Sequence, residues 1–544
     1  MATGPPIGHR RTLLGPLDEP IDGLDWNAAA RAAAHRYVDA LAARLLHAGL
    51  VARVPASTAE VLLALELTKS PSSLYWRPMP CTLVVCHDVV GPSMAGPGIR
   101  YWEMSAALAR HGLDVTLAAP TGSAFPAPPF ATLAYQLGDP ALVEAARRAD
   151  ALVVTGPVLE QFPALKELEQ PIVVDLYDPF LFENLHRLGD TPAGWAEHSG
   201  GLRVLAEQAR RGDFFVCANE RQRDLYLGML AAWGRVGPTT YAADPTLDRL
   251  LAVVPFGLPS APPAPGRGIR GVEPGVADGD RVVVWNGGLW DWFDADTAIR
   301  AVARLAPELP ALRLVFLGTR HPNPAIGEPE SARRAKRLAD ELGLVGRHVF
   351  FRDWTPYQER GACLLDADLA ISLHLAGVET RFASRTRLLD CIWAGLPLVT
   401  TEGDAIGDEL VRRGLAAAAA PGDAAAAGEA LRALLAEPDA RGARRGAFQE
   451  LRDELTWERA VAPLAAFLRA PRRAADAPRR SAERGDEERR PWGSPPTAGE
   501  ATTRPERSRL PARTRDDAPA ARVPTAASGE GTWRRRLAGL LPRL

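Results

Sequence analysis

Between residues 80 and 470, short runs of β-branched and aliphatic residues alternate with stretches of helical spacing. In the first half these runs are 82–86, 115–118, 151–155, 172–176, 214–218 and 253–254, and in the second half 282–285, 312–317, 349–351, 369–373 and 398–401. Such alternation predicts parallel sheets, because a helix must carry the chain back before the next parallel strand begins. We therefore expect an α/β protein with two Rossmann-like domains, over residues 80–260 and 261–470.

The segments around these domains differ in composition. Apolar residues at helical spacing in 26–48 and 58–67 predict an N-terminal helical extension over residues 1–79. Residues 259–275 are rich in Pro and Gly, as in a linker. From residue 471 to the end, Arg, Pro, Ala and Ser dominate, and Ile, Phe and Tyr are absent. Such a segment buries too little apolar surface to offset its ordering entropy, which predicts a disordered tail.

The end of this tail, WRRRLAGLLPRL, has an amphipathic pattern. Its apolar side chains share one helical face, and arginines occupy the other side. The apolar face consists of Trp533, Leu537, Leu540, Leu541 and Leu544. The pattern favours binding to a membrane surface that carries anionic lipid. A disordered, adhesive chain end is the alternative, since Pro542 interrupts a helix.

Composition excludes several classes of protein. The formal net charge of −2 gives no reason to expect a nucleic-acid partner. The five cysteines are scattered through apolar runs, as expected for reduced core residues. The N-terminus lacks the apolar core of a signal peptide, and no apolar run approaches the roughly 20 residues that span a bilayer. We therefore expect a cytoplasmic protein, peripheral at the inner face of the membrane if its C-terminal end binds lipid.

Metal-binding patterns are missing from the sequence. The strings Asp294–Asp296 and Asp366–Asp368 flank predicted helices rather than strand ends, and we interpret them as helix caps. Asn219 is interpreted as another cap, with Gln222 and Arg223 on the surface of the helix that follows. No His-rich or Cys-rich cluster has the spacing of zinc ligands. The sequence therefore predicts no metal ion and no other cofactor.

Residues 379–401, ETRFASRTRLLDCIWAGLPLVTT, read as a charged loop, a short helix and a buried strand. Ser384 is the predicted N-cap of the helix. Gly395 lies just past the last helical turn, and Pro397 prevents the helix from continuing. The strand that follows is β-branched in character and completes a helix-to-strand unit of the second domain.

Arg385 and Arg387 lie at the start of this predicted helix, where the helix dipole disfavours cations. An anion docked between the two guanidinium groups would explain their position. Exposed backbone N–H groups and forked arginine donors both suit a phosphate. The alternative is that both arginines point into solvent or pair with Glu379 and Asp390.

Glycines follow the first predicted strand of each domain. Gly96 and Gly98 belong to the loop in the first domain, and Gly287 and Gly288 to the loop in the second. Glycine lets a ligand approach the backbone closely, and the start of a helix exposes N–H groups. A purely structural role in turns is the alternative.

Polar or aromatic side chains end three further predicted strands. Asp178, in PIVVDLYDP, points into the space beyond the sheet if the strand keeps its register, although Asp before Pro is also a common helix cap. Trp354 follows the strand at 349–351, and His374 ends the strand at 369–373. Ligands of such sheets bind beyond the carboxyl ends of the strands, so these residues are candidates for a binding site.

The stretch DCIWAGLPLV, residues 390–399, is similar to the donor-binding segment of GT-B glycosyltransferases, in particular glycosyltransferase family 4. The family pattern is Glu, seven residues, Glu, and then Ala-x-x-x-Gly-x-Pro-Val. Asp390 stands at the second acidic position, whereas the first falls on Phe382, with Glu379 as the nearest carboxylate. The resemblance covers residues 80–470 and implies two Rossmann-like domains that face each other across a cleft.

The resemblance also implies a donor and a set of site residues. The donor would be a nucleoside diphosphate sugar, and Asp178 and Glu379 would be the catalytic residues. The implied contacts are Ser384, Arg385, Arg387, Gly287 and Gly288 for the diphosphate, Asp390 for the ribose, Trp354 for the nucleobase, Glu379 and Asp178 for the transferred sugar, and Gly96 and Gly98 for the approach of donor or acceptor.

The leading hypothesis is a glycosyltransferase that moves a sugar from this donor to a glycan or lipid-linked acceptor in cell-surface polysaccharide biosynthesis. The resemblance implies retention of configuration. The alternative is a catalytically degenerate GT-B protein that binds nucleotide sugars or assembles with a partner. Phe382 at the first acidic position favours it, as do Trp290 and Trp292 where relatives carry an Arg and a Lys. A nicotinamide-dependent oxidoreductase is set aside, because the Gly-x-Gly-x-x-Gly fingerprint is missing.

Overall fold

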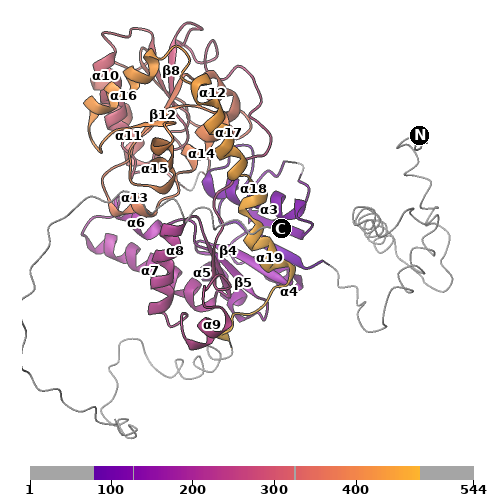
Figure 1. Cartoon of the computed structure of the whole chain (residues 1–544). Coiled ribbons are helices and arrows are strands. Elements are labelled where there is room, and N and C mark those ends of the chain that lie inside the picture. Colours follow the sequence, from indigo (N-terminus) through magenta and orange to yellow (C-terminus); the bar gives the residue numbers. More distant parts are fainter. Residues whose placement is uncertain (1–78, 127, 324–325, 478–544) are drawn as a thin grey trace, which may run out of the picture. The chain divides into compact units, whose positions relative to one another are not determined.

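The computed structural model describes residues 79–126, 128–323 and 326–477. Within them the chain forms two parallel sheets, of seven and six strands, each flanked by helices (Figure 1). The strand order is β3-β2-β1-β4-β5-β6-β7 in the first sheet and β10-β9-β8-β11-β12-β13 in the second. Each sheet therefore starts in its interior and grows outward in both directions, as in a Rossmann-like fold. The predicted α/β class with two Rossmann-like domains is confirmed.

The strands of the first domain are β1 (Cys81–Val85), β2 (Asp114–Pro120), β3 (Ala131–Tyr135), β4 (Ala151–Thr155), β5 (Ile172–Asp175), β6 (Phe214–Cys217) and β7 (Leu251–Val253). Its helices are α3 (Gly96–Arg110), α4 (Pro140–Arg148), α5 (Val158–Gln161), η2 (Pro163–Glu167), α6 (Phe180–Leu185), α7 (Pro192–Arg211), α8 (Glu220–Ala232) and α9 (Pro238–Ala243). All strand pairs of this sheet are parallel.

The strands of the second domain are β8 (Arg281–Trp285), β9 (Leu312–Phe316), β10 (Val349–Phe351), β11 (Leu369–Ser372), β12 (Leu398–Thr400) and β13 (Ala416–Ala418). Its helices are α10 (Ala295–Leu305), α11 (Glu330–Glu341), α12 (Arg360–Asp366), α13 (Val378–Phe382), α14 (Thr386–Ala394), α15 (Ala405–Arg412), α16 (Ala424–Ala436), η3 (Gly442–Arg444) and α17 (Arg445–Glu454). These strand pairs are also parallel.

Every strand predicted from the sequence is present, within two residues at each end. The structure adds β3 and β13, which lie at the edges of their sheets. β3 is largely exposed, and the Ala-rich β13 lacks β-branched residues. Neither carries the apolar run that marks a central strand, so neither was predicted.

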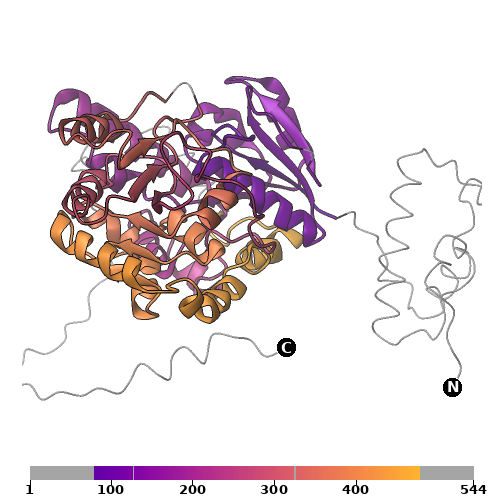
Figure 2. The same cartoon turned by 90° about the horizontal axis from the view of Figure 1, so that it is seen from above.

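Two short helices, α18 (Trp457–Ala460) and α19 (Ala462–Arg469), follow α17 and return to the first domain. α18 packs against α3, and α19 against β7. The yellow-orange end of the described chain lies beside the indigo α3 in both views (Figures 1 and 2). The rings of Phe214 and Phe467 stack at 4.5 Å. The last helices of the predicted second domain are therefore packed on the first.

The chain beyond α19 is also attached to the first domain. Asp476 and Arg235 form a buried ion pair, with Nε and Oδ2 2.6 Å apart. Arg473 pairs with Asp213 at 3.1 Å. Residues 471–477, predicted to belong to a disordered tail, thus contact the first domain directly.

An ion pair inside the first domain fixes the start of α3 against the end of β5. Arg100 donates to both carboxylate oxygens of Asp175, at 2.6 and 3.1 Å, and both side chains are fully buried. The guanidinium also donates to the carbonyls of Val254 and Pro255. The hydroxyl of Tyr101 donates to Asp175. Arg100 therefore makes its ion pair and its hydrogen bonds within the first domain, and its role there is structural.

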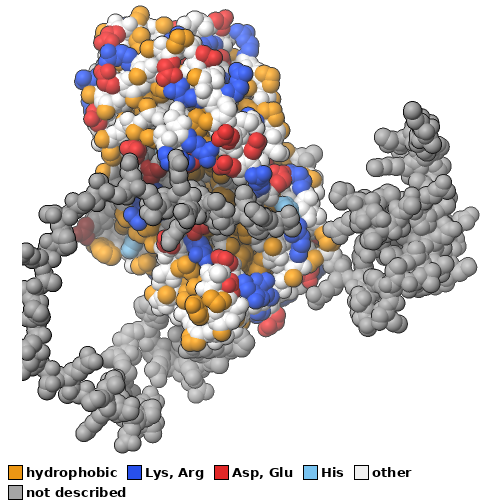
Figure 3. Space-filling view, in the orientation of Figure 1, with side chains coloured by type: hydrophobic (Ala, Val, Ile, Leu, Met, Phe, Trp, Pro, Cys, Tyr) orange, Lys and Arg blue, Asp and Glu red, His pale blue; other side chains and the backbone are white. Residues whose placement is uncertain are grey.

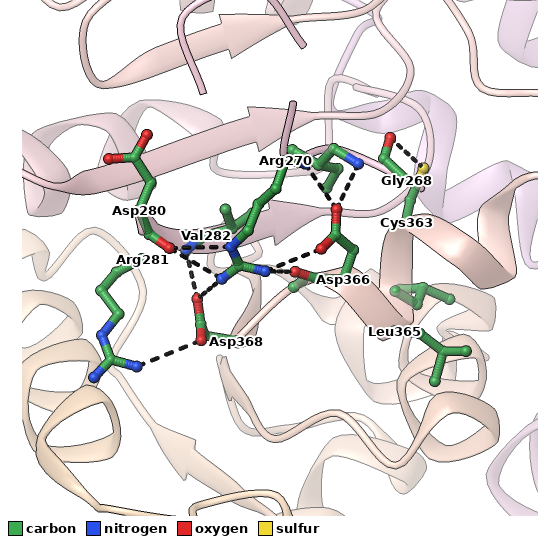
Figure 4. Close-up of polar contacts among 12 residues, drawn as sticks. Gly268, Arg270, Asp280, Arg281, Val282, Cys363, Leu365, Asp366 and Asp368 are labelled. Carbon is green, nitrogen blue, oxygen red and sulfur yellow. Dashed lines mark hydrogen bonds and ion pairs between the residues drawn. The ribbon is translucent and has the colours of Figure 1, made fainter. Parts of the chain in front are cut away.

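A second network fixes the segment between the two domains (Figure 4). Asp366 accepts from the backbone N–H groups of Ile269 and Arg270, both at 2.7 Å, and the guanidinium of Arg270 pairs with Asp366 and Asp368. Asp368 also accepts from the N–H of Val282 at 2.7 Å. The interpretation of these two aspartates as helix caps is wrong, because a distant arginine and backbone amides occupy their oxygens. They tie the Pro/Gly-rich linker to the second domain.

Further sequence-based expectations concern the cysteines, membrane-spanning helices, surface charge and the chain ends. All five cysteines are free thiols, and four of them are buried. In the part of the chain that the structure describes, no helix combines the length and apolar character needed to cross a membrane. Basic and acidic side chains are interspersed over the second domain in Figure 3. The predicted N-terminal extension and the C-terminal amphipathic segment lie outside the described residues.

Candidate functional site

The two arginines singled out in the sequence lie where α13 meets α14. Helix α14 begins at Thr386, and Arg385 occupies its N-cap position with φ −75° and ψ 89°. Ser384 precedes the cap, so its predicted N-cap role is wrong. Arg385 Nη2 donates to Oε2 of Glu379 at 2.6 Å, and this contact with α13 holds Arg385 outside the helix. The helix therefore starts one residue later than predicted, after a residue whose side chain is bound to α13.

The Glu379–Arg385 pair is almost completely buried, with side chains 1% and 3% exposed. The alternative in which Arg385 pairs with Glu379 is thus the one observed. The pair is incomplete, however, because Oε1 of Glu379 and Nε of Arg385 are buried and have no hydrogen-bond partner. One carboxylate oxygen and one guanidinium N–H of this pair are therefore buried without a partner.

Arg387, the second residue of α14, is also buried. Its Nη2 donates to the carbonyl oxygen of Gly288 at 2.7 Å, and its guanidinium lies 3.7 Å from the ring centre of Phe293. No ion pair within the described residues includes it. Burial, followed by repulsion from Arg385, lowers the pKa of Arg387 to about 9. A guanidinium remains charged at neutral pH, so this position is electrostatically unfavourable until an anion binds.

The backbone at Gly287 and Gly288 faces this guanidinium. Gly287 has φ +101°, a conformation that side chains rarely adopt, and a Cβ built there would lie 3.8 Å from Arg387 Nη2. Asn286 donates from Nδ2 to the carbonyl of Arg387 at 2.8 Å and ties this loop to α14. The structure thus brings both predicted glycines to Arg387, which supplies positive charge beside a loop that has none.

Arg385 and the residues that contact it or respond to its charge contain five buried polar atoms without a hydrogen-bond partner: Nε of Arg385, Nη1 of Arg387, Oε1 of Glu379, Nδ1 of His374 and Oδ2 of Asp404. The His374 ring lies 5.4 Å from that of Phe293, and the charge of Arg385 acts on both His374 and Asp404. Buried polar groups are normally hydrogen-bonded. This cluster therefore suits a ligand that carries anionic oxygens for the arginines and hydroxyl donors for the carboxylates.

Solved structures resemble the two-domain arrangement over 72% of the chain. Sucrose-phosphate synthase from Thermosynechococcus elongatus matches with a TM-score of 0.53 and 16% identity, over 98% of that chain. Anabaena HepE, solved in complex with UDP-glucose, matches with a TM-score of 0.52 and 14% identity, over 99% of that chain. Both are GT-B glycosyltransferases. The chain has the GT-B fold. The sequence itself matches no protein-family model and no curated protein.

In this GT-B structure, Trp354 neighbours the Gly287 loop. A Cβ built on Gly318 would lie 2.9 Å from the Trp354 ring and 3.3 Å from the carbonyl carbon of Gly287. The ring of Trp354 lies 5.9 Å from that of His321, and the His321 ring lies 5.4 Å from that of Trp290. Aromatic rings therefore lie next to the Gly287–Gly288 loop.

Asp390, one turn beyond Arg387, does not pair with either arginine of the cluster. Its Oδ1 accepts from Nε of Arg360 at 3.2 Å. The Arg360 guanidinium lies between the rings of Tyr357 and Trp393, at 3.6 and 4.6 Å. Sequence reasoning missed Arg360, because its partners are aromatic rings and a carboxylate on other elements. The side chain of Asp390 remains partly exposed beside it.

Asp404 caps α15, where its Oδ1 accepts from the N–H groups of Ile406 and Gly407, while Oδ2 has no partner. Burial raises the pKa of Asp404 to about 6, against the opposing effects of Arg385 and the two amides. A raised pKa means that ionisation opposes folding. The stability that the protein has while Asp404 is protonated is fully present below the unfolded pKa of 3.8. It is lost as the pH rises through about 6, the pKa of Asp404 in the folded protein.

We expect Asp404→Asn to gain stability relative to the wild type as the pH rises, by up to about 3 kcal/mol between about pH 4 and about pH 8. Asparagine keeps the capping oxygen but has no proton to lose. Melting temperatures of both proteins across this range measure the effect. Asp423→Asn, at the exposed N-cap of α16, is the matched control. Parallel pH profiles for Asp404→Asn and the wild type would contradict the prediction.

Gly96 and Gly98 form the first turn of α3, but their surroundings differ. A Cβ on Gly98 would lie 2.5 Å from the carbonyl oxygen of Val89 and 2.8 Å from Cβ of Met94. A Cβ on Gly96 would meet nothing within 4 Å. Gly98 is therefore required by the packing of its own loop, and only Gly96 leaves the backbone open to a ligand.

We expect Gly98→Ala to destabilise the protein by about 2 kcal/mol, because backbone must move to relieve the clash. Gly96→Ala is expected to leave stability unchanged or slightly raised, since alanine favours a helix more than glycine does. Thermal melts of the two variants measure the difference. Equal melting temperatures would show that the close contact at Gly98 is relieved without cost.

Asp178 follows β5, and its carboxyl group and that of Glu183 on α6 each shift the pKa of the other. Burial raises the pKa of both carboxyl groups, that of Glu183 well above its usual value. Nδ1 of the nearby His87 is buried without a partner, and burial lowers the pKa of His87. The charges of Glu379 and Arg385 of the second domain also act on Glu183.

The first turn of α8 bridges the two domains. Asn219 caps this helix as predicted, accepting from the N–H of Gln222 at 2.9 Å. Gln222 is not on the surface, contrary to the prediction, because its Nε2 donates to the carbonyls of both Tyr177 and Phe382. Arg221 pairs with Asp408 of α15 at 2.7 Å. These contacts attach the segment between α13 and α14 to the first domain.

Ser384 lines a different space from the arginines. It borders an apolar pocket of about 240 Å³, together with Leu389 and Ile392 of α14 and Phe256 of the first domain. The predicted phosphate contact of Ser384 therefore stays a sequence-based prediction. Within the described ranges, no group of three or more His, Cys, Asp or Glu side chains could hold a metal ion.

Proposed function

We propose that the protein is a glycosyltransferase that takes a sugar from a nucleoside diphosphate sugar. The observation that carries the proposal is the buried Arg387 guanidinium, which has no carboxylate partner and an unpaired N–H. It lies beside a second arginine and an open glycine backbone. Forked donors next to exposed backbone match the oxygens of a diphosphate.

Arg385, Arg387 and the Gly287–Gly288 backbone would hold the diphosphate. As the bond between the anomeric carbon and the phosphate oxygen breaks, its electron pair leaves on the nucleoside diphosphate. The guanidinium groups would stabilise this charge in a site that excludes water, where such contacts are strongest. Glu379 would accept hydroxyl groups of the transferred sugar through its free Oε1.

Asp390 would accept the ribose hydroxyls, and Trp354 would support the nucleobase. Asp178 would lie beside the anomeric centre, and Gly96 would leave room for donor or acceptor. The acceptor we propose is a glycan or a lipid-linked glycan of cell-surface polysaccharide biosynthesis, with retention of configuration and a hexose as the transferred sugar. The metal-independent reaction would take place in the cytoplasm or at the inner membrane face. The proposal rests on the resemblance for these finer assignments.

A panel of UDP-, GDP- and ADP-sugars, each tested by thermal shift, examines the donor. A ligand held at about 100 times its dissociation constant should add about 2.7 kcal/mol of stability. UDP-glucose heads the panel because HepE was solved with it. No shift with any nucleotide sugar would contradict the proposal.

A GT-B protein that binds nucleotide sugars without turnover is the second candidate. Phe382, which stands eight positions before Asp390 where the family pattern has its first acidic residue, favours it. Release of free nucleotide from the bound sugar separates the two candidates. Binding with no release, with water and with glycan acceptors alike, would establish the second.

A further inference from the structure

Arg360, the first residue of α12, is held against two aromatic rings. Its guanidinium carbon lies 3.6 Å from the ring centre of Tyr357 and 4.6 Å from that of Trp393. Trp393 is itself buried and donates from Nε1 to the carbonyl of Ala261 at 2.8 Å. Nη1 of Arg360 donates to the carbonyl of Tyr357, also at 2.8 Å. A guanidinium that packs on two rings and bonds to the backbone has little freedom to rotate.

Tyr357 attaches this group of side chains to the first domain. Its backbone N–H donates to the carbonyl of Pro92 at 2.6 Å, and its hydroxyl donates to Oε1 of Glu103 at 2.6 Å. Pro92 belongs to the loop that connects β1 to α3, and Glu103 is a residue of α3. Arg360 is therefore packed on a tyrosine that is bound to the first domain and on a tryptophan that is bound to the linker.

The carboxylate partner of Arg360 is Asp390 of α14. Nε of Arg360 donates to Oδ1 of Asp390 at 3.2 Å. Among the described residues, no hydrogen bond or ion pair includes Oδ2 of Asp390, and this side chain is 27% exposed. Asp390 follows Arg387 by three residues, so the two side chains share a face of α14. Arg360 therefore holds one oxygen of Asp390 and leaves the other open, on the helix face that carries Arg387.

We propose that Arg360 positions Asp390 so that its open oxygen accepts the ribose hydroxyl groups, and that the pair thereby selects ribonucleotide donors. This inference rests on the proposed function. A partly exposed carboxylate loses rotamer freedom when it binds a ligand, and this loss reduces affinity. The contact with Arg360 removes that freedom before the nucleotide arrives. Arg360 acts through Asp390 and is therefore a positioning residue.

The test compares the affinities of UDP, GDP and ADP with those of their dideoxy analogues, which lack both ribose hydroxyls, by titration calorimetry of the full chain. The wild type should bind its preferred ribonucleotide at least about tenfold more tightly than the analogue, because hydrogen bonds to charged groups are strong. Arg360→Met should lower this ratio by about threefold to tenfold. Both ligands meet the same protein, so a loss of stability alone leaves the ratio unchanged.

Arg313→Met is the matched control and should keep the ratio of the wild type. Arg313 pairs with Asp280 at 2.9 Å in the second domain, and its side chain is 16% exposed, against 14% for Arg360. It lies near the start of β9, at the opposite end of the strand from the candidate site.

A double variant separates positioning from a merely structural role. In an Asp390→Ala background, Arg360→Met should leave the ratio unchanged, because the side chain through which it acts is gone. The inference would be overturned by a wild type that binds both forms equally, or by an Arg360→Met ratio within about twofold of the wild type. It would also be overturned if Arg360→Met lowered the ratio equally in both backgrounds. These three results leave the proposed function intact, whereas a wild type that binds no nucleotide would remove it, and the inference with it.

Discussion

Replacing Arg387 with methionine is expected to weaken nucleotide-sugar binding by about 100-fold or more, while the free protein stays at least as stable as before. Removing one member of a buried, hydrogen-bonded charge contact typically costs about 2–5 kcal/mol of binding free energy. In the free protein the same guanidinium is desolvated without a carboxylate partner. Replacing such a charge by an apolar side chain is often neutral or stabilising. Methionine also preserves the packing on Phe293.

Binding isotherms and thermal melts of Arg387→Met and the wild type measure the two effects together. Arg381→Met is the matched control, because Arg381 is exposed in the last turn of α13 and its loss changes the net charge equally. The control should bind within about twofold of the wild type, since exposed charges contribute little. If Arg387→Met binds as well as the control, Arg387 does not contact the phosphates.

Replacing Asp175 with alanine is expected to destabilise the first domain by about 3–5 kcal/mol, which lowers its melting temperature by roughly 10 °C. The change leaves the Arg100 guanidinium fully buried without its carboxylate. It also removes the acceptor of the Tyr101 hydroxyl and of the Tyr177 N–H. Calorimetry of the full chain measures the effect on the first domain.

Glu144→Ala is the control for this prediction. Glu144 forms exposed pairs with Arg147 and Arg148 on α4 of the same domain, and such pairs contribute less than about 1 kcal/mol. The double variant Arg100→Met, Asp175→Leu should recover much of the stability, because neither charge then remains buried. A loss for Asp175→Ala no larger than that for Glu144→Ala would show that Arg100 finds other partners.

The sequence predicted the interior of each sheet better than its edges. β4, which is buried along its whole length, was predicted to the residue. β13 consists of three alanines and pairs only with β12 at the sheet edge. A central strand must bury both faces and so reveals itself by its side chains, whereas an edge strand is recognised only by its partner.

The candidate site was predictable where its signal was local. Two cations at a helix start conflict with the helix dipole, and this conflict located Arg385 and Arg387. The N-cap was placed on Ser384 rather than Arg385, because serine is a common N-cap and the pairing of Arg385 with Glu379 was only one of two alternatives. Gln222 was placed on the surface, although it bonds to Phe382, 160 positions away. Such a partner leaves no trace in the neighbouring sequence.

The buried Arg235–Asp476 pair and the stacking of Phe467 on Phe214 have a consequence for biosynthesis. The first domain is built from two pieces of chain that are separated by the whole of the second. A nascent chain that has emerged only through β7 still lacks α18, α19 and Asp476. Its apolar surface at α3 and β7 stays uncovered while the ribosome adds about 200 more residues, at roughly 5–20 residues per second. The lobe that is synthesised first is therefore the one completed last.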